Sequence, residues 1–253
     1  MRGLYNFLYW IYFVFSFPYY LLRGWGRGDW QRGFAQTFGH YDINLKQSIT
    51  NRHLCWVQAP GLGDVRVCGE LIHALEGRLP NVKFIVSTTR AETWSELRKR
   101  LPPKVGKIYH PLDRRDCVAR ALNAVHPRAI ILIGGQVQPN FIWRARTRHF
   151  PVFLVNARLS RRLYLRYQRF GFLFRHVFES LTLIGAQTEE QASRFRAVGG
   201  ATEAIQVLGD LAQNPAAIGR TVETILAHLS ASDLYIAPVP APRSSVSGDN
   251  TRS

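Results

Sequence analysis

Two glycines and an aspartate in the stretch LCWVQAPGLGDVRVCGELIHAL, residues 54–75, are the residues best placed to do chemistry. The sequence predicts a buried strand over Leu54–Ala59 and a helix from Asp64 onward, because apolar residues recur there at steps of three and four: Val67, Leu71, Ile72 and Leu75. Gly61 and Gly63 allow the connecting loop to turn tightly and to approach a ligand closely. Ligands of open α/β sheets bind beside such loops, so Asp64 is the first functional candidate.

Asp64 also has a simpler explanation. A carboxylate at a helix N-terminus can cap the backbone or be favoured by the helix dipole, and that environment lowers its pKa and makes it a poorer base. The loop is not a dinucleotide fingerprint, because Arg66 occupies the third glycine position and no acid follows the next predicted strand. The histidines show no metal-ligand spacing. We therefore predict neither a cofactor nor a metal.

The rest of the chain alternates predicted strands with predicted helices. Ala129–Ile133 is a continuous apolar run of the kind found in a central parallel strand. The other predicted strands are Lys83–Thr88, Lys107–Tyr109, Val152–Val155, Leu181–Ile184 and Ile205–Leu208, and the predicted helices are Ala91–Arg100, Asp113–Val125, Asn140–Arg148, Ser160–Phe172 and Glu189–Val198. This alternation predicts a Rossmann-like α/β domain, a parallel sheet with helices on both faces.

The two ends of the chain differ from this domain. Within residues 1–23, the run Leu4–Leu22 is nearly all apolar and densely aromatic, about as long as a membrane-crossing helix, and Arg23 and Arg27 follow it. We predict a membrane anchor there, and Pro18 and the tyrosines favour a helix lying in the interface over one that spans. A basic connector is expected over 24–50, with a short helix around Gln31–Phe38. The domain itself is expected over 51–212, a helical extension over 213–236 and a disordered Pro/Ser tail over 237–253.

The composition implies an anionic partner. Lys and Arg number 33 against 17 for Asp and Glu, which gives a formal charge of +16. The sequence contains no known nucleic-acid motif, so nucleic acid is not the expected partner. Five arginines crowd one region, either as a solvated helix face or as a contact to lipid phosphates: Arg161, Arg162, Arg166, Arg169 and Arg175. Three cysteines without a CxxC pair predict a reduced, cytosolic setting.

Several motifs, in one order and at consistent spacing, resemble a known family. They are the opening LYNFLYWIYFVFSFPYYLLRG, GFAQTFGHY at 33–41, WVQAPGLGDVR at 56–66, STT at 87–89, YHPLD at 109–113, QPN at 138–140, PVFLVNARLS at 151–160 and QASRF at 191–195. Together they resemble the N-terminal domain of 3-deoxy-D-manno-octulosonic acid (Kdo) transferase over about residues 1–212.

The resemblance implies one half of a GT-B glycosyltransferase of lipopolysaccharide biosynthesis. In that family the N-terminal domain carries a membrane anchor and receives a lipid A precursor, and a C-terminal domain binds CMP-Kdo. The family acts at the cytoplasmic face of the bacterial inner membrane. Its general base is a glutamate in the loop that corresponds here to Gly61–Asp64, so the resemblance assigns Asp64 that role with a side chain one methylene shorter.

Other family positions differ in this sequence. Two carboxylates before the family's WPN motif correspond to Gly134 and Gln136, and the motif's aromatic residue corresponds to Gln138. A functional lysine corresponds to Ala212. No donor-binding domain follows in this sequence, so we expect a separate polypeptide to supply it if the chain is active.

We predict substrate contacts, beside the catalytic Asp64, at Gly61, Gly63, Thr88, Thr89, Asn140, Asn156, Arg158 and Ser160. Thr88 and Thr89 have a loop-capping alternative, and Asn140 and Ser160 have a helix-capping one. Two functions stay open at this point. The chain is either the acceptor half of a Kdo transferase or a non-catalytic, membrane-bound module that binds an anionic glycolipid or a partner protein.

Overall fold

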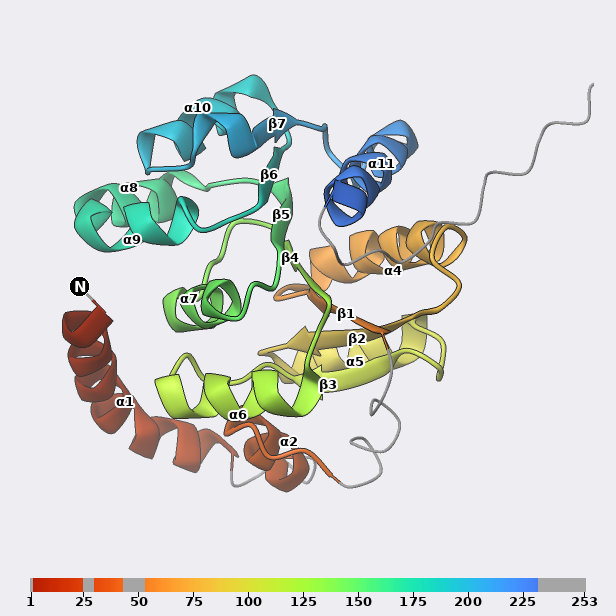
Figure 1. Ribbon diagram of the computed structural model, residues 1–253. Helices are drawn as coiled ribbons and strands as arrows, with labels where there is room; N and C mark the ends of the chain where they lie inside the picture. Colours follow the sequence, from red (N-terminus) through yellow and green to blue (C-terminus); the bar gives the residue numbers. More distant parts are fainter. Residues whose placement is uncertain (1, 25–29, 43–52, 232–253) are drawn as a thin grey trace, which may run out of the picture.

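A parallel sheet runs through the centre of the molecule in the computed structural model, which describes residues 2–24, 30–42 and 53–231 (Figure 1). Its strand order is β3-β2-β1-β4-β5-β6-β7, and every neighbouring pair is parallel. The strands are β1 (His53–Gln58), β2 (Val82–Thr88), β3 (Gly106–Tyr109), β4 (Ala129–Ile133), β5 (Val152–Ala157), β6 (Leu183–Ala186) and β7 (Ile205–Val207). The order reverses between β1 and β4, where doubly wound folds bind their ligands.

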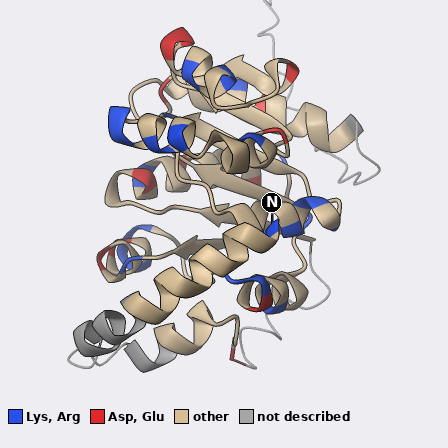
Figure 2. Cartoon of the chain, turned by 90° about the vertical axis from the view of Figure 1, so that its left-hand side faces the viewer, with Lys and Arg blue, Asp and Glu red and all other residues tan. Residues whose placement is uncertain are grey.

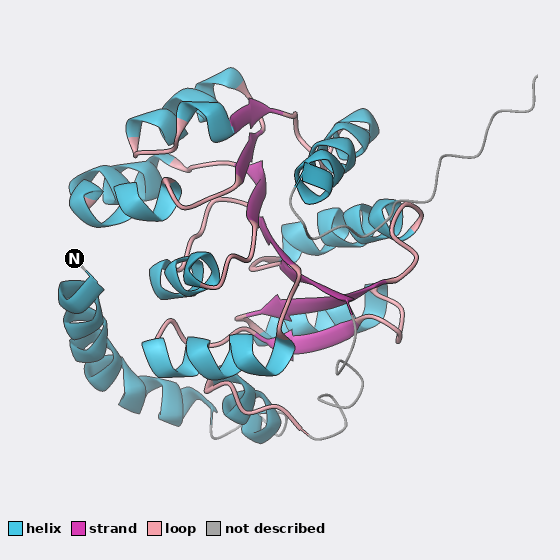
Figure 3. Ribbon diagram, viewed as in Figure 1, coloured by secondary structure: helices cyan, strands magenta, loops and turns pink. Residues whose placement is uncertain are grey.

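Helices cover both faces of the sheet, which confirms the predicted layers (Figure 3). One face carries α4 (Leu62–Glu76), α5 (Ala91–Arg100) and α11 (Pro215–Ala231). The other carries α6 (Arg115–Val125), α7 (Pro139–Thr147), α9 (Gly171–Phe178) and α10 (Glu189–Ala197), with α8 (Arg161–Arg169) beside α9 and the short η1 (Thr202–Ala204) before β7. The central strands are buried on both faces, which explains the continuous apolar run of β4.

Helix α2 (Trp30–Thr37) closes the β3 edge of the sheet. The side chain of Gln36 accepts a hydrogen bond from the Tyr109 backbone at 2.9 Å, and the Thr37 carbonyl accepts one from Leu112 at 2.8 Å. A Cβ on Gly33 would stand 2.6 Å from the Tyr109 ring, so only glycine allows this approach. The GFAQTFGHY motif therefore has a structural role in covering an edge strand.

Helix α1 (Arg2–Gly24) docks on the domain through Asp113. The carboxylate of Asp113 accepts hydrogen bonds from the Tyr5 hydroxyl at 2.5 Å and from the backbone of Asn140 and Phe141 at 3.1 and 2.9 Å. Asn140 also donates to the Asn6 side chain at 2.9 Å. Burial raises the pKa of Asp113 to about 7, although these three donors favour the charged form. The YHPLD motif thus joins α1 to the start of α7.

The side of α1 that faces away from the domain is not covered by other described elements (Figure 2), and large apolar side chains are exposed on it. Its exposed side chains include Leu4, Phe7, Leu8, Trp10, Tyr12, Val14 and Phe15. None of the described helices combines the length and hydrophobicity needed to cross a membrane. Membrane association remains a prediction.

The prediction of one helix over Ser160–Phe172 was wrong, because the chain forms α8 and α9 with a break at Phe170. The break redirects the chain so that Leu173, Val177 and Phe178 enter the core. The predicted strand at Leu181–Ile184 begins two residues later, at Leu183. The predicted tail over 237–253 and two parts of the connector, 25–29 and 43–50, lie outside the described residues.

A buried chain of polar side chains ties β1, β2 and the start of α7 together. The Trp56 indole donates to the Ser87 hydroxyl at 2.7 Å, and that hydroxyl lies 2.9 Å from Nδ1 of His110. Nε2 of His110 lies 2.8 Å from Oε1 of Gln138. A neutral imidazole with its proton on Nε2 satisfies both neighbours. Burial lowers the pKa of His110 to about 3.

Stability should therefore fall in acid through His110. The unfolded chain takes up this proton near pH 6.5 and the folded chain does not, so the free energy of unfolding should drop by about 2 kcal/mol from this group between pH 7 and pH 5. In denaturant titrations at pH 7 and pH 5, the free energy of unfolding of His110→Asn should fall by about 2 kcal/mol less than that of the unmodified chain. His126→Asn, at an exposed position, is the control. An unchanged loss in His110→Asn would contradict this assignment.

Candidate functional site

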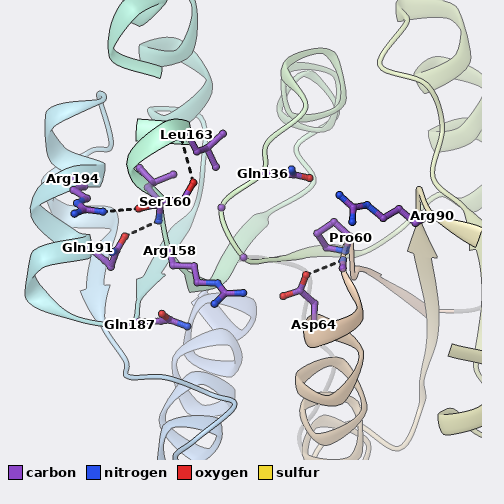
Figure 4. A pocket seen from close by; sticks show the side chains of 14 residues that line it. Pro60, Asp64, Arg90, Gln136, Arg158, Ser160, Leu163, Gln187, Gln191 and Arg194 are labelled. Carbon is purple, nitrogen blue, oxygen red and sulfur yellow. Dashed lines mark hydrogen bonds between the residues drawn. The ribbon is translucent and has the colours of Figure 1, made fainter. Parts of the chain in front are cut away.

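A polar pocket of about 510 Å³ opens at the carboxyl edge of the sheet, at the reversal of strand order (Figure 4). Loops that follow five strands contribute to it. Its lining residues are Pro60, Gly61, Asp64, Arg90, Gly134, Gly135, Gln136, Arg158, Leu159, Ser160, Leu163, Gln187, Gln191 and Arg194. Asp64 is the only carboxylate among these described residues.

Asp64 lies in the first turn of α4, three residues after Gly61, the N-cap. Its Oδ2 accepts a hydrogen bond from the Gly61 backbone at 2.9 Å. The sequence suggested a carboxylate whose pKa the helix terminus lowers, but the pKa of Asp64 is raised, because burial outweighs the Gly61 bond and the nearby Arg158 and Arg90. With only 8% of its surface exposed, Asp64 is a better base than a surface helix cap.

Two arginines bring positive charge to the pocket. Figure 4 shows the side chains of Arg158 and Arg90 entering from opposite sides, with Asp64 between the loops that carry them. Arg158 follows β5 and Arg90 follows β2, so two different strands position the guanidinium groups. Both act on the Asp64 charge. Such a pocket suits a ligand that presents an anionic group and a hydroxyl together.

The segment that carries Arg158 is held by α10. The side chain of Gln191 accepts a hydrogen bond from the Leu159 N–H at 2.7 Å, and the Arg194 guanidinium donates to the Leu159 carbonyl at 2.7 Å. Ser160 then caps α8, since its hydroxyl accepts a hydrogen bond from the Leu163 backbone at 3.3 Å. Both backbone groups of Leu159 are therefore satisfied by one helix, which fixes the residues on either side.

The loop after β4 lines the pocket and lies against the Arg158 segment. A Cβ on Gly135 would stand 1.9 Å from the Arg158 carbonyl oxygen, so no other residue fits. Gly134 has φ +92°, which also favours glycine. The Tyr167 hydroxyl donates to the Gly135 carbonyl at 3.1 Å and accepts from the Val137 N–H at 3.2 Å.

The predicted site residues divide into two groups. Gly61, Asp64, Arg158 and Ser160 line the pocket together. The others lie outside its lining: Gly63, Thr88, Thr89, Asn140 and Asn156.

Three members of the second group make structural contacts. Thr88 is buried and its hydroxyl accepts a hydrogen bond from the Arg90 backbone at 3.4 Å. Asn140 links α7 to Asp113 and Asn6. The Asn156 side chain accepts hydrogen bonds from Gln187 at 2.8 Å and from the Leu211 backbone at 3.1 Å. Gly63 and Thr89 are exposed.

Sequence reasoning missed several lining residues, and four of them have polar side chains: Arg90, Gln187, Gln191 and Arg194. Arg90 and Gln187 follow β2 and β6 at the same edge as Asp64, so their positions carried a usable signal. Gln191 and Arg194 belong to the QASRF motif, whose spacing predicts a helix but not the segment that the helix holds. Among the described residues, no group of three or more His, Cys, Asp or Glu side chains could hold a metal ion.

Comparison with known proteins gives a consistent result. The family model described as "3-Deoxy-D-manno-octulosonic-acid transferase (kdotransferase)" matches residues 32–213. A 3-deoxy-D-manno-octulosonic acid transferase of Haemophilus influenzae is 27% identical over 72% of this chain and 42% of its own length. A bifunctional glycosyltransferase/methyltransferase of Fusobacterium nucleatum is 22% identical over 64% of this chain and 26% of its own length. The chain thus matches less than half the length of each relative.

Among solved structures, UDP-GlcNAc 2-epimerase of Neisseria meningitidis aligns with 71% of this chain and 53% of its own. The TM-score is 0.45 and the identity 12%, which is too low a similarity to support a functional argument.

The contribution of the hydrogen bond from the Leu159 N–H to the Gln191 side chain can be measured directly. Gln191→Leu removes the acceptor, so exchange of the Leu159 amide hydrogen should accelerate by about tenfold, the worth of one net hydrogen bond. Gln191→Glu keeps an oxygen acceptor and should retain slow exchange. NMR-detected hydrogen exchange provides the measurement, with Arg196→Ala, on the same helix, as the control. Equal exchange rates in the leucine and glutamate variants would show that the side chain does not hold the segment.

Proposed function

Because the chain belongs to the 3-deoxy-D-manno-octulosonic-acid (Kdo) transferase family, we propose that its pocket is the acceptor side of a Kdo transfer to a lipid A precursor. The observation that carries the proposal is Asp64: a buried carboxylate with a raised pKa, alone among the lining residues, between Arg158 and Arg90. A phosphorylated acceptor would bring an anionic group for the arginines and a hydroxyl for Asp64.

In the proposed reaction Asp64 takes the proton from an acceptor hydroxyl. The hydroxyl oxygen forms a bond to the anomeric carbon of Kdo as the bond from that carbon to the CMP phosphate breaks, and CMP leaves with the electron pair. The raised pKa of Asp64 supports this role, because a carboxylate with a higher pKa accepts a proton more readily. Arg158 and Arg90 would hold the acceptor phosphate.

The donor side needs groups outside this pocket. We propose that CMP-Kdo is held by a second domain facing the same edge of the sheet, in the two-domain arrangement that GT-B enzymes use. A separate polypeptide is one source of that domain. Gly134 and Gln136 line the pocket where the family resemblance placed carboxylates, so Asp64 would act there without a second acid.

A second candidate function follows from the same residues. Without those carboxylates, and with Ala212 in place of a functional lysine, the chain would be a non-catalytic module that binds an anionic glycolipid in this pocket. Its binding would rest on Arg158 and Arg90, and Asp64 would contribute only hydrogen bonds.

We propose the cytoplasmic face of the bacterial inner membrane as the place of action. The support is the uncovered apolar face of α1, with Phe7 59%, Trp10 57% and Phe15 81% exposed. Side chains of this kind are favoured at a lipid interface.

Complementation tests the transfer. The chain should be expressed, alone and with an isolated CMP-sugar-binding domain, in a Gram-negative strain depleted of its own Kdo transferase, and lipid A species read by mass spectrometry. We expect Kdo-modified lipid A when the donor domain is present, its loss in Asp64→Ala and its retention in Asp64→Glu. Asp116→Ala, at an exposed carboxylate, is the control. Unmodified precursor in every strain, with the protein present at the membrane, would contradict a catalytic role.

Ligand binding by the purified chain tests the pocket for both candidate functions, the transferase and the non-catalytic module. Arg158→Ala should weaken binding of the lipid A precursor in detergent by about 10- to 100-fold, the range expected for a lost charge-assisted hydrogen bond. Arg196→Ala, outside the pocket, should bind as the unmodified chain does. Equal affinities for the two variants, measured by calorimetry, would remove the pocket from both candidate functions.

A further inference from the structure

Positive charge without acidic partners gathers on α8 and α9. Several arginines of other helices are paired with carboxylates: Arg194 with Glu190, Arg196 with Glu189, and Arg120 with Asp116. By contrast, within the described part of the chain, no ion pair forms at Arg161, Arg162, Arg169 or Arg175. All four are exposed. Uncompensated charge of this kind is available to an anionic partner.

Large apolar side chains lie among these arginines. Leu165 is 52% exposed, Phe170 41% and Phe172 47%. We call these three residues and the four unpaired arginines the basic face. A nucleic-acid duplex gains little from exposed leucine and phenylalanine side chains on a helix, whereas a lipid interface accepts them beside cationic groups.

A second cavity of about 510 Å³ opens beside the basic face, between α9 and the end of α10. Gln168, Phe172, Arg175 and His176 line it. Gly199 has φ +104°, and a Cβ there would stand 2.6 Å from Cγ of Arg175, so the arginine stem rests on the turn after α10. Arg175 lines the cavity, and the planar set of donors on its guanidinium group suits a phosphate.

The basic face lies on the same side of the molecule as the uncovered face of α1 (Figures 1 and 2). Helix α7 joins them. Tyr5 of α1 packs edge-on against Trp143 at 5.7 Å, and Arg146 donates to the carbonyl of Glu179 after α9 at 3.2 Å. One flat partner can therefore contact an apolar helix and a basic face together.

We propose that the basic face docks on an anionic lipid bilayer, with a headgroup phosphate at Arg175, while the uncovered face of α1 enters the interface beside it. This inference deepens the membrane part of the proposed function and is independent of the Asp64 pocket. Asp113 holds α1 against the domain, so the two parts would meet the bilayer in one fixed orientation. The arginines supply the preference for anionic lipid and α1 the apolar contact.

Vesicle binding by the full chain tests the proposal. Co-sedimentation should use phosphatidylcholine vesicles with and without about 30% phosphatidylglycerol. The basic-face variant is Arg161→Gln/Arg169→Gln/Arg175→Gln. The matched control, Lys83→Gln/Arg98→Gln/Lys99→Gln, removes the same charge from exposed positions on β2 and α5. Circular dichroism confirms that each variant is folded.

The basic-face variant should lose affinity for anionic vesicles by about fivefold for each arginine removed, and the control should lose much less. Arg175→Gln alone should lose about fivefold. Phe7→Ser/Trp10→Ser should weaken binding to both kinds of vesicle. Equal losses in the basic-face variant and the control would overturn the proposal, since net charge alone would then explain the binding. The proposal would also be overturned if the unmodified chain bound a DNA duplex and the basic-face variant lost this binding while its vesicle binding was unchanged.

Discussion

The close approach of two loops at the carboxyl edge of the sheet is the constraint on which the site depends. Gly135 lies so near the Arg158 carbonyl that a single methyl group would force the loops after β4 and β5 apart. Because they stay together, Arg158 reaches the pocket that contains Asp64. Tyr167 holds one loop and α10 holds the other, so helices on one face of the sheet set the geometry of the pocket. The chemistry of Asp64 follows, since burial in this pocket raises its pKa.

Much of the fold could be predicted because its signals are local. The ends of β4 and α5 fall where an apolar run and a helical spacing placed them. The break at Phe170 could not be predicted, because the basic and aromatic pattern continues through it and the burial of Leu173, Val177 and Phe178 explains the turn. Asp64 and Arg158 were predicted as site residues because each comes soon after a strand, and both line the one pocket.

What the sequence could not supply were contacts between distant segments. Asn140 and Asn156 belong to motifs that suggest a binding role, yet their side chains hold α1 and the segment at Leu211. Gln191 holds Leu159 from another element, and neither residue alone suggests this contact. The sign of the Asp64 pKa shift depends on burial by the neighbouring loops, so helix position alone gave the opposite direction.

The central claim is that the pocket at the edge of β1, β4 and β5 receives the acceptor. The most direct measurement is backbone amide NMR of the chain during titration with the lipid A precursor in detergent micelles. The account predicts that saturable shifts appear at Gly61, Gly135, Leu159 and Ser160, which line the pocket. Saturable shifts confined to α11, away from the pocket, with those four amides unmoved, would contradict it.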